Sequence, residues 1–225
     1  MNILYEERGS DSPIIETIMQ GHTLGPDTTT RPAENHWHMV FARHNGTRYS
    51  FLVGPWTSSG VVTVPENADI LWIKFRLGTF MPHLPMRNLL NTETILGEGV
   101  LNSFWLNGSA WQLPDYHNAE TFVDRLVRDD LLVFDPVVNS ALHDRPPELS
   151  DRTVRHHFLQ TTGLTQNHIR QMERAERATA LLQQGTSILG TVFETGYFDQ
   201  SHLTRSLKRF IGHTPAQIIQ LSAPE

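Results

Sequence analysis

The sequence predicts an α+β protein in which a small β-rich domain, cupin-like or barrel-like, precedes an all-α domain with two helix-turn-helix units. Two observations carry this prediction. Short apolar and β-branched segments, separated by glycine and proline, fill much of the first 115 residues. From about residue 116, apolar side chains recur at helical spacing between capping residues. We therefore expect one domain over residues 1–115 and a second over residues 116–225.

Composition excludes several classes of protein before any motif is considered. The chain has 225 residues, of which 39% are hydrophobic, and this is enough for a packed core. The absence of cysteine excludes disulfide frameworks, thiolate zinc sites and cysteine nucleophiles. The N-terminus is acidic, and no apolar run approaches the roughly 18 residues that a membrane span needs. We therefore expect a cytoplasmic protein without a membrane partner.

Four segments of the first domain have the character of strands. They are His38–Arg43, Thr47–Val53, Gly60–Val64 and Ile70–Leu77. Turn residues such as Gly46 and the Gly54-Pro55 pair separate them. Strands this short and this closely spaced predict a small barrel or sandwich. Residues 79–113 contain several prolines and glycines, and we expect short helices and loops there.

The second domain divides into helices at its capping residues. The predicted helices are 118–131, 136–142, 150–162, 166–184, 187–195, 199–211 and one that opens at Thr214-Pro215. Asp135-Pro136 has the residues of a helix start, and Arg145-Pro146-Pro147 is expected to end that helix. Helices 150–162 and 199–211 each follow a shorter helix and a turn. Two helix-turn-helix units are therefore predicted.

Helices 150–162 and 199–211 each have an apolar face and a face rich in hydrogen-bond donors. In helix 199–211 the expected inward residues are Leu203, Leu207, Phe210 and Ile211, and the polar ones are Gln200, Ser201, His202, Arg205, Lys208 and Arg209. In helix 150–162, Val154 and Phe158 are expected inward, and Arg152, Arg155 and His156 outward. Such faces suit the major groove of DNA. The helix between them spans about 27 Å, near the roughly 34 Å of one DNA turn, so one chain could read two successive major-groove segments.

The net charge of the chain is only weak evidence for or against a polyanionic partner such as DNA. The whole chain has a net charge of −6, but residues 1–147 hold 10 basic and 17 acidic side chains, whereas residues 148–225 hold 8 and 7. The C-terminal third is therefore the surface that repels a polyanion least.

Four stretches carry a resemblance to a known family. They are LSDRTVRHHF at 149–158, TTGLT at 161–165, RAERATALLQQG at 174–185 and GYFDQSHLTRSLKRFIGHTPAQI at 196–218. With them, residues 149–217 resemble the DNA-binding domain of AraC/XylS-type transcriptional regulators. The last stretch matches the family pattern almost position by position, including the closing Gly-x-Thr-Pro.

This resemblance implies a regulator that binds double-stranded DNA sequence-specifically, and not an enzyme; no cofactor is expected. The residues that it places on DNA are Arg152, Thr153, Arg155 and His156 in the first reading helix and Gln200, Ser201, His202, Arg205 and Lys208 in the second. It also implies that the N-terminal domain is a sensor, a dimerisation unit or both, which allows a small-molecule effector and a homodimer. The operator, the effector and the sign of regulation stay open.

Two alternatives come from the residues themselves. His36 and His38 lie two apart on a predicted strand, with Glu34 and His44 nearby, which is the start of a metal site in a small β-barrel. A metal-dependent enzyme with a helical appendage is therefore the second hypothesis, although no further ligand follows at a barrel-enzyme spacing. A protein-interaction module that no longer binds DNA is the third. The aromatic residues Trp37, Phe41, Trp56, Trp72 and Phe75 are expected in the core of the barrel.

Overall fold

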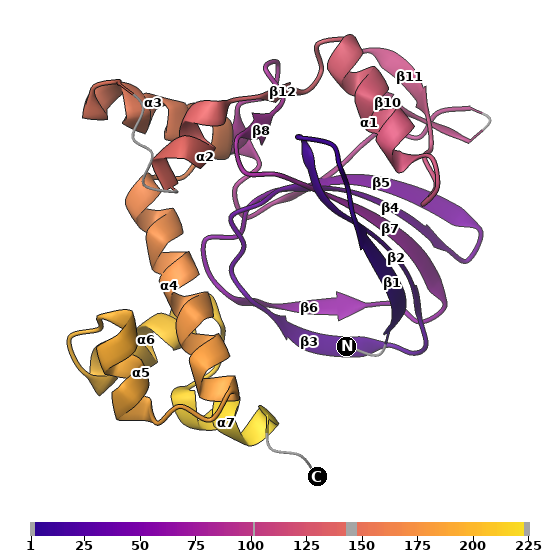
Figure 1. Cartoon of the computed structure of the whole chain (residues 1–225). Coiled ribbons are helices and arrows are strands. Elements are labelled where there is room, and N and C mark those ends of the chain that lie inside the picture. Colours follow the sequence, from indigo (N-terminus) through magenta and orange to yellow (C-terminus); the bar gives the residue numbers. More distant parts are fainter. Residues whose placement is uncertain (1–2, 101, 143–147, 223–225) are drawn as a thin grey trace. The chain divides into compact units, whose positions relative to one another are not determined.

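A computed structural model describes residues 3–100, 102–142 and 148–222 (Figure 1). The chain forms two compact units, and neither is a single continuous segment. The unit that we call the β-rich unit comprises Met1–Thr28, His36–Pro55 and Thr63–Thr165. The helical unit comprises Thr29–Asn35, Trp56–Val62 and Gln166–Glu225. The helix end predicted at residues 145–147 lies outside the described residues.

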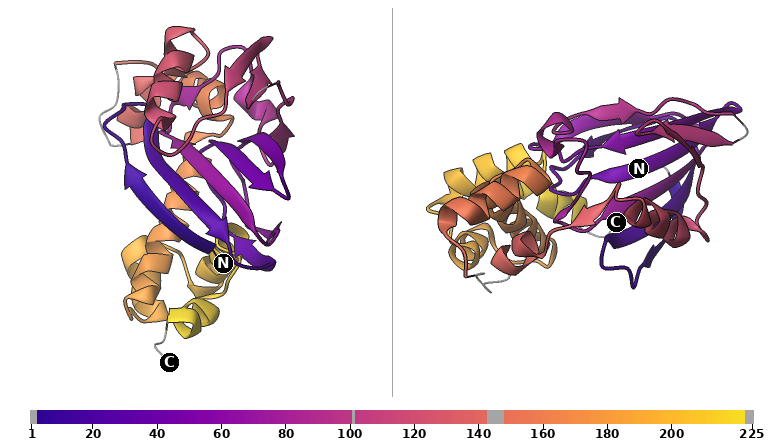
Figure 2. Two further views of the ribbon diagram at one scale, coloured as in Figure 1. Left: turned by 90° about the vertical axis from the view of Figure 1, so that its right-hand side faces the viewer. Right: turned by 90° about the horizontal axis from the view of Figure 1, so that it is seen from above.

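The strands build one large antiparallel sheet and three small pairs. They are β1 (Ile3–Gly9), β2 (Ile15–Thr23), β3 (Asp27–Arg31), β4 (His38–His44), β5 (Thr47–Val53), β6 (Gly60–Val64), β7 (Ala68–Phe75), β8 (Thr79–Phe80), β9 (Glu93–Ile95), β10 (Ser103–Leu106), β11 (Ser109–Gln112) and β12 (Val133–Phe134). The sheet has the order β1-β2-β7-β4-β5-β9, and its strands curve strongly (Figure 2). The pairs are β10-β11, β12-β8 and β3-β6.

The four predicted strands are present, two with the expected bounds and two displaced by one or two residues. The expectation of short helices and loops over residues 79–113 is wrong where this region forms strands. This region contains β8, β9, β10 and β11, and its only helical turn among the described residues is the 3₁₀ helix η1 (Met86–Asn88). These strands have two to four residues each, which is too short for an alternating pattern to show. Between β10 and β11, Asn107 and Gly108 have φ of 49° and 77°, as the Asn-Gly turn of a hairpin requires.

The first helix, α1 (Ala119–Arg128), shares the core of the sheet. The ring of its Phe122 contacts the rings of Phe41, Phe104 and Trp111 at centroid distances of 5.8, 6.1 and 6.2 Å. The predicted core aromatics Trp37, Phe41 and Phe75 are buried, but Trp56 and Trp72 are only half-buried. The aromatic core is thus built jointly by the sheet, the β10-β11 hairpin and a helix that follows both in sequence.

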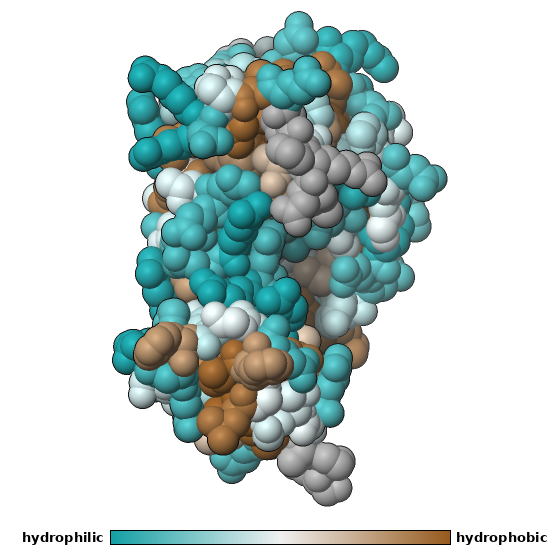
Figure 3. Space-filling view, turned by 60° about the vertical axis from the view of Figure 1, so that its left-hand side comes forward, coloured by the Kyte–Doolittle hydropathy of each residue, from teal (hydrophilic) through white to brown (hydrophobic). Residues whose placement is uncertain are grey.

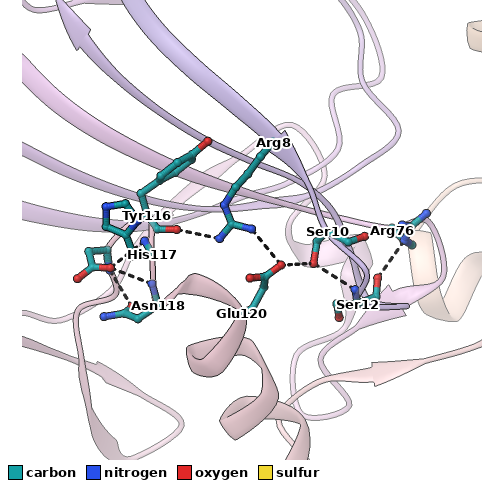
Figure 4. Close-up of polar contacts among 9 residues, drawn as sticks. Arg8, Ser10, Ser12, Arg76, Tyr116, His117, Asn118 and Glu120 are labelled. Atoms are coloured by element: carbon teal, nitrogen blue, oxygen red, sulfur yellow. Dashed lines mark hydrogen bonds and ion pairs between the residues drawn. The ribbon is translucent and has the colours of Figure 1, made fainter.

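Polar contacts hold the start of α1 to β1 and the segment after it (Figure 4). Arg8 lies 3.0 Å from the Glu120 carboxylate and donates to the backbone carbonyl of Tyr116 at 2.9 Å, and Ser10 donates to Glu120 at 2.7 Å. Asn118 occupies the predicted N-cap position, but its side chain accepts from the backbone N–H of Asp115. The start of α1 is therefore fixed by side chains of β1 and of the segment after it, and not by a side-chain cap.

The β-rich unit also contains the next two helices, α2 (Pro136–Leu142) and α3 (Asp151–Thr162). Asp135 accepts from the backbone N–H of Val137 at 2.9 Å, as its place before the proline predicts. The hydroxyl of Ser150 caps α3, and Gly163, with φ of 71°, ends it. Helix α3 packs against α2, η1 and β8, and its Phe158 is fully buried.

The helical unit contains α4 (Gln166–Gln183), α5 (Ile188–Thr195), α6 (Gln200–Phe210) and α7 (Pro215–Ser222). Side chains cap two of these helices: Ser187 accepts from the N–H of Gly190 at 3.1 Å, and Thr214 and Gln217 cap α7 reciprocally. Helix α4 buries an apolar stripe along its length, which holds the other helices. None of the described helices combines the length and the apolar character needed to cross a membrane.

Candidate nucleic-acid interface

Helix α6 has the two faces that its sequence predicts. Leu203, Leu207 and Phe210 are buried, whereas Gln200, Ser201, Arg205 and Lys208 are exposed. Asp199 is extended, and its carboxylate accepts from the backbone N–H of His202 at 2.6 Å, which fixes the first turn of the helix. The apolar stripe thus fixes α6 in the unit while its donor-bearing side chains stay in solvent.

The turn before α6 is held by Tyr197. Its ring is buried, its hydroxyl lies 2.8 Å from Ser206 Oγ, and the guanidinium of Arg174 lies 4.9 Å from its ring centroid. The ring of His202 meets it edge-on at 5.1 Å, and His202 is half-buried as a result. Of the residues predicted to meet DNA on α6, His202 is therefore the one most engaged with the protein itself.

The C-terminal end of α6 is satisfied by two segments from far earlier in the chain. Within the helical unit, the N–H of Ala33 donates to the carbonyl of Phe210 at 2.6 Å, and the N–H of Ser59 donates to the carbonyl of Arg209 at 2.8 Å. The Ser59 hydroxyl donates to the carbonyl of Lys208 at 3.1 Å. A helix leaves its last carbonyls without partners, so these bonds replace water at the end of α6. Nothing in the sequence signals this contact.

The residues of α3 that were predicted to contact DNA differ in their exposure. Arg152, Arg155 and His156 are exposed. Thr153 is half-buried, and its hydroxyl lies 2.9 Å from that of the capping residue Ser150, so it takes part in the cap. His157, on the neighbouring face, lies 2.5 Å from the carboxylate of Asp135.

Residues 148–220 match a family model described as a helix-turn-helix domain, a segment that runs from just before α3 into α7. The chain carries an AraC/XylS-type helix-turn-helix domain. This domain supports a DNA-binding transcriptional regulator of this type. No curated protein and no solved structure gives a significant match to the chain.

Four cations on α3 and α6 have no acidic partner among the described residues. Arg152 and Arg155 on α3, and Arg205 and Lys208 on α6, form no ion pair with any residue that the structure describes. All four are exposed. Unpaired cations of this kind contribute the salt-dependent part of DNA affinity, because they replace counterions at phosphates.

The candidate metal ligands of the second hypothesis do not form one cluster among the described residues. His36 precedes β4, and its Nε2 atom lies 2.8 Å from the carboxylate of Glu16, which Lys74 approaches at 3.4 Å. The hydrogen bond from His36, with the charge of Lys74, lowers the pKa of Glu16 to about 2. Across the described ranges, no three His, Asp or Glu side chains are placed to share a metal ion, so Glu34, His36, His38 and His44 do not form one cluster.

Sequence reasoning missed an open cavity of about 780 Å³ in the β-rich unit. It is lined by β1, β2, β4, β5, β7 and residues 113–116, including the aromatic side chains Tyr5, Phe41, Tyr49 and Tyr116. On its wall, Asp69 lies 2.8 Å from both Arg43 and His22, and their hydrogen bonds lower the pKa of Asp69. Because five strands contribute to the lining, no local pattern in the sequence could reveal it.

Proposed function

We propose that the regulator binds double-stranded DNA sequence-specifically and uses α3 and α6 to read two successive major-groove segments. The observation that carries the proposal is α6: a helix fixed by a buried stripe, with exposed donors from its first turn onward. The N-terminal part of a recognition helix is the part that meets base edges. The 18 residues of α4 between the two reading helices span about 27 Å, which supports the spacing of the two segments.

The exposed side chains of α6 divide into two roles by their chemistry. Arg205 can donate two hydrogen bonds to guanine, and Gln200 can both donate to and accept from adenine. Lys208 lies one turn further along, in the basic last turn, and suits a phosphate. On α3, Arg152 and Arg155 are the corresponding cations, with His156 beside them and Thr153 engaged in the cap.

The experiment measures affinity for duplexes selected by the full chain from a random library of about 30 base pairs, which is long enough for two half-sites. Arg205→Ala should weaken binding to the selected duplex about 5- to 150-fold and binding to a scrambled duplex far less, because a bidentate contact is worth about 1–3 kcal/mol. Lys208→Ala should weaken both alike and reduce the salt slope by about one. Arg177→Ala, which removes an exposed arginine from α4, is the matched control.

Each outcome has a definite meaning. Equal loss from Arg205→Ala and Arg177→Ala would contradict base reading by α6 and leave only general charge attraction. Failure of the chain to enrich any sequence would contradict sequence-specific binding altogether. Loss of selectivity at only one half of the selected site after Arg152→Ala would support reading by both helices.

We also propose that residues 1–115 act as the sensor or dimerisation domain, with residues 116–225 as the DNA-binding domain. The cavity of about 780 Å³ supports a small-molecule effector, because ligand pockets in proteins commonly have about 300–1,000 Å³. A compound that raises the melting temperature of the chain, and no longer does so in Tyr49→Ala, would support a site there. The homodimer is tested by light scattering, which measures the molar mass of the chain in solution. A cytoplasmic location stays a prediction that depends on the DNA-binding function.

A further inference from the structure

The most exposed large apolar side chain among the described residues belongs to Phe198, at 91%. It lies in the turn immediately before Asp199, the cap of α6. Leu189 and Phe193 on α5 are also exposed, at 72% and 88%, and apolar side chains gather on this face of the helical unit (Figure 3). Monomeric proteins rarely leave such groups together in water without a binding role.

The outward direction of Phe198 follows from its two neighbours. Tyr197 points inward, where Ser206, Arg174 and His202 hold its ring, and Asp199 is fixed by its bond to the first turn of α6. A residue at this position often packs on the helix as a hydrophobic staple with the residue five places later, here Leu203. Leu203 is fully buried and Phe198 is almost fully exposed, so the staple is not made. The phenyl ring is therefore kept free beside the first turn of the reading helix.

We propose that Phe198 is a specificity-determining residue that contacts the 5-methyl group of a thymine next to the bases that α6 reads. This inference rests on the proposed function. The thymine methyl is the one apolar group that base pairs present in the major groove, and phenylalanine is a side chain suited to it. Phe198 is adjacent in sequence to Asp199 and Gln200, where a recognition helix meets base edges. Leu189 and Phe193 lie on the preceding helix, α5, and are not adjacent to the first turn of α6.

The experiment uses the full chain and a duplex that it selects from a random library. Each thymine is replaced in turn by deoxyuridine, which lacks only the 5-methyl group. At one thymine the replacement should weaken binding of the unaltered protein about fourfold, as expected for one buried methyl group. Phe198→Ala should bind the thymine duplex about fourfold more weakly and show no further loss with deoxyuridine at that position.

Phe193→Ala is the matched control, because it removes an equally exposed phenyl ring from α5. It should keep the dependence on the thymine methyl. Melting temperatures of both variants should equal that of the unaltered protein, since neither side chain is buried.

Three results would overturn the inference. The first is that no thymine methyl affects binding, and the second is that Phe198→Ala remains as sensitive to deoxyuridine as the unaltered protein. The third is that Phe193→Ala and Phe198→Ala both leave DNA affinity unchanged but lower transcription in vitro, which would make the surface a protein-docking site. Selective DNA binding without a methyl effect rejects only this inference, whereas a chain that selects no sequence rejects the proposed function with it.

Discussion

Helices α3 and α6 start in the same way but are held by different parts of the chain. Each follows an extended residue whose side chain accepts from the N–H of the third helical residue: Ser150 from Thr153, and Asp199 from His202. Each exposes arginine, but α6 buries an apolar stripe whereas α3 buries a single apolar side chain, that of Phe158. Helix α3, however, packs against α2, η1 and β8 within the β-rich unit, whereas α6 packs against α4, α5 and α7 within the helical unit.

The ends of the two helices show the same difference. Gly163, which ends α3, lies against the backbone of Arg87 and the side chain of Leu90 in the β-rich unit. The carbonyls that end α6 accept from Ala33 and Ser59 in the helical unit. The segment that matches one family model therefore contributes to two compact units. Family likeness follows local pattern and capping, whereas the packing of each helix depends on residues far away in sequence.

The largest expected effect is a loss of stability, and it tests whether α3 and α6 unfold separately. Phe158→Ala on α3 should lower the free energy of unfolding by about 3–5 kcal/mol, and Leu207→Ala on α6 by about 2–5 kcal/mol, because each leaves a cavity at a fully buried site. Hydrogen exchange measures where each variant opens. Phe158→Ala should speed exchange in α2 and η1, and Leu207→Ala in α4, α5 and α7.

Exchange that rises over the same amides in both variants would show that α3 and α6 open as one unit, contrary to the comparison. Arg155→Ala is the control, because it shortens an exposed side chain of α3 and should change neither stability nor exchange by more than about 0.5 kcal/mol.

The parts of this structure that could be predicted are those that a few adjacent residues decide. The cap at Asp199, the buried Leu203 and Leu207, and the exposed Arg205 all lie within one short stretch, and all were predicted correctly. The β10-β11 hairpin was missed although its Asn-Gly turn was visible, because its strands have only four residues each. A two-residue turn signal was the better guide there than periodicity.

The missed contacts all join residues that are distant in sequence. Ser59 caps the end of α6 across 149 positions, and the cavity wall brings β1 together with residues 113–116. The histidine spacing in the sequence likewise does not show that Nε2 of His36 lies 2.8 Å from the carboxylate of Glu16, a residue 20 positions earlier in the chain. The DNA-contacting residues stay predictions, and their exposure supports most of them.

The second prediction compares the glycines that end the first helix-turn-helix unit and α5. Gly163 and Gly196 have φ of 71° and 68°, so alanine at either position adopts a left-handed conformation that costs about 1–2 kcal/mol. A Cβ at Gly196 would meet no atom within 4 Å, whereas a Cβ at Gly163 would lie 3.1 Å from the backbone nitrogen of Arg87. Gly163→Ala should therefore be the more destabilising of the two in urea titrations, by about 1 kcal/mol.

Asparagine tolerates the left-handed region better than alanine does, so Gly196→Asn should recover part of the stability that Gly196→Ala loses. Equal losses of stability for the two alanine variants would mean that a Cβ at Gly163 does not clash with the backbone of η1. The packing at the end of α3 would then be looser than the contacts of Gly163 indicate.

The smallest expected effect is a change in the pH dependence of stability, which differs between the two units. In the β-rich unit, Glu16 has a pKa of about 2 against an ordinary 4.5, so its pairing stabilises the fold above pH 4.5 and is lost as the pH falls towards 2. In the helical unit, burial lowers the pKa of His168 below 6.5, with Arg209 acting in the same direction, so stability is lost as the pH falls below 6.5.

Glu16→Gln should lower the free energy of unfolding by about 1 kcal/mol at pH 7, a value reduced for solvent screening, and should not change it at pH 2. His168→Gln should remove the loss that begins at pH 6.5 and leave the acid transition unchanged. If each variant alters the exchange of amides in its own unit only, the two units respond to acid independently; if either alters both, the reading helices share one folding equilibrium despite their different packing.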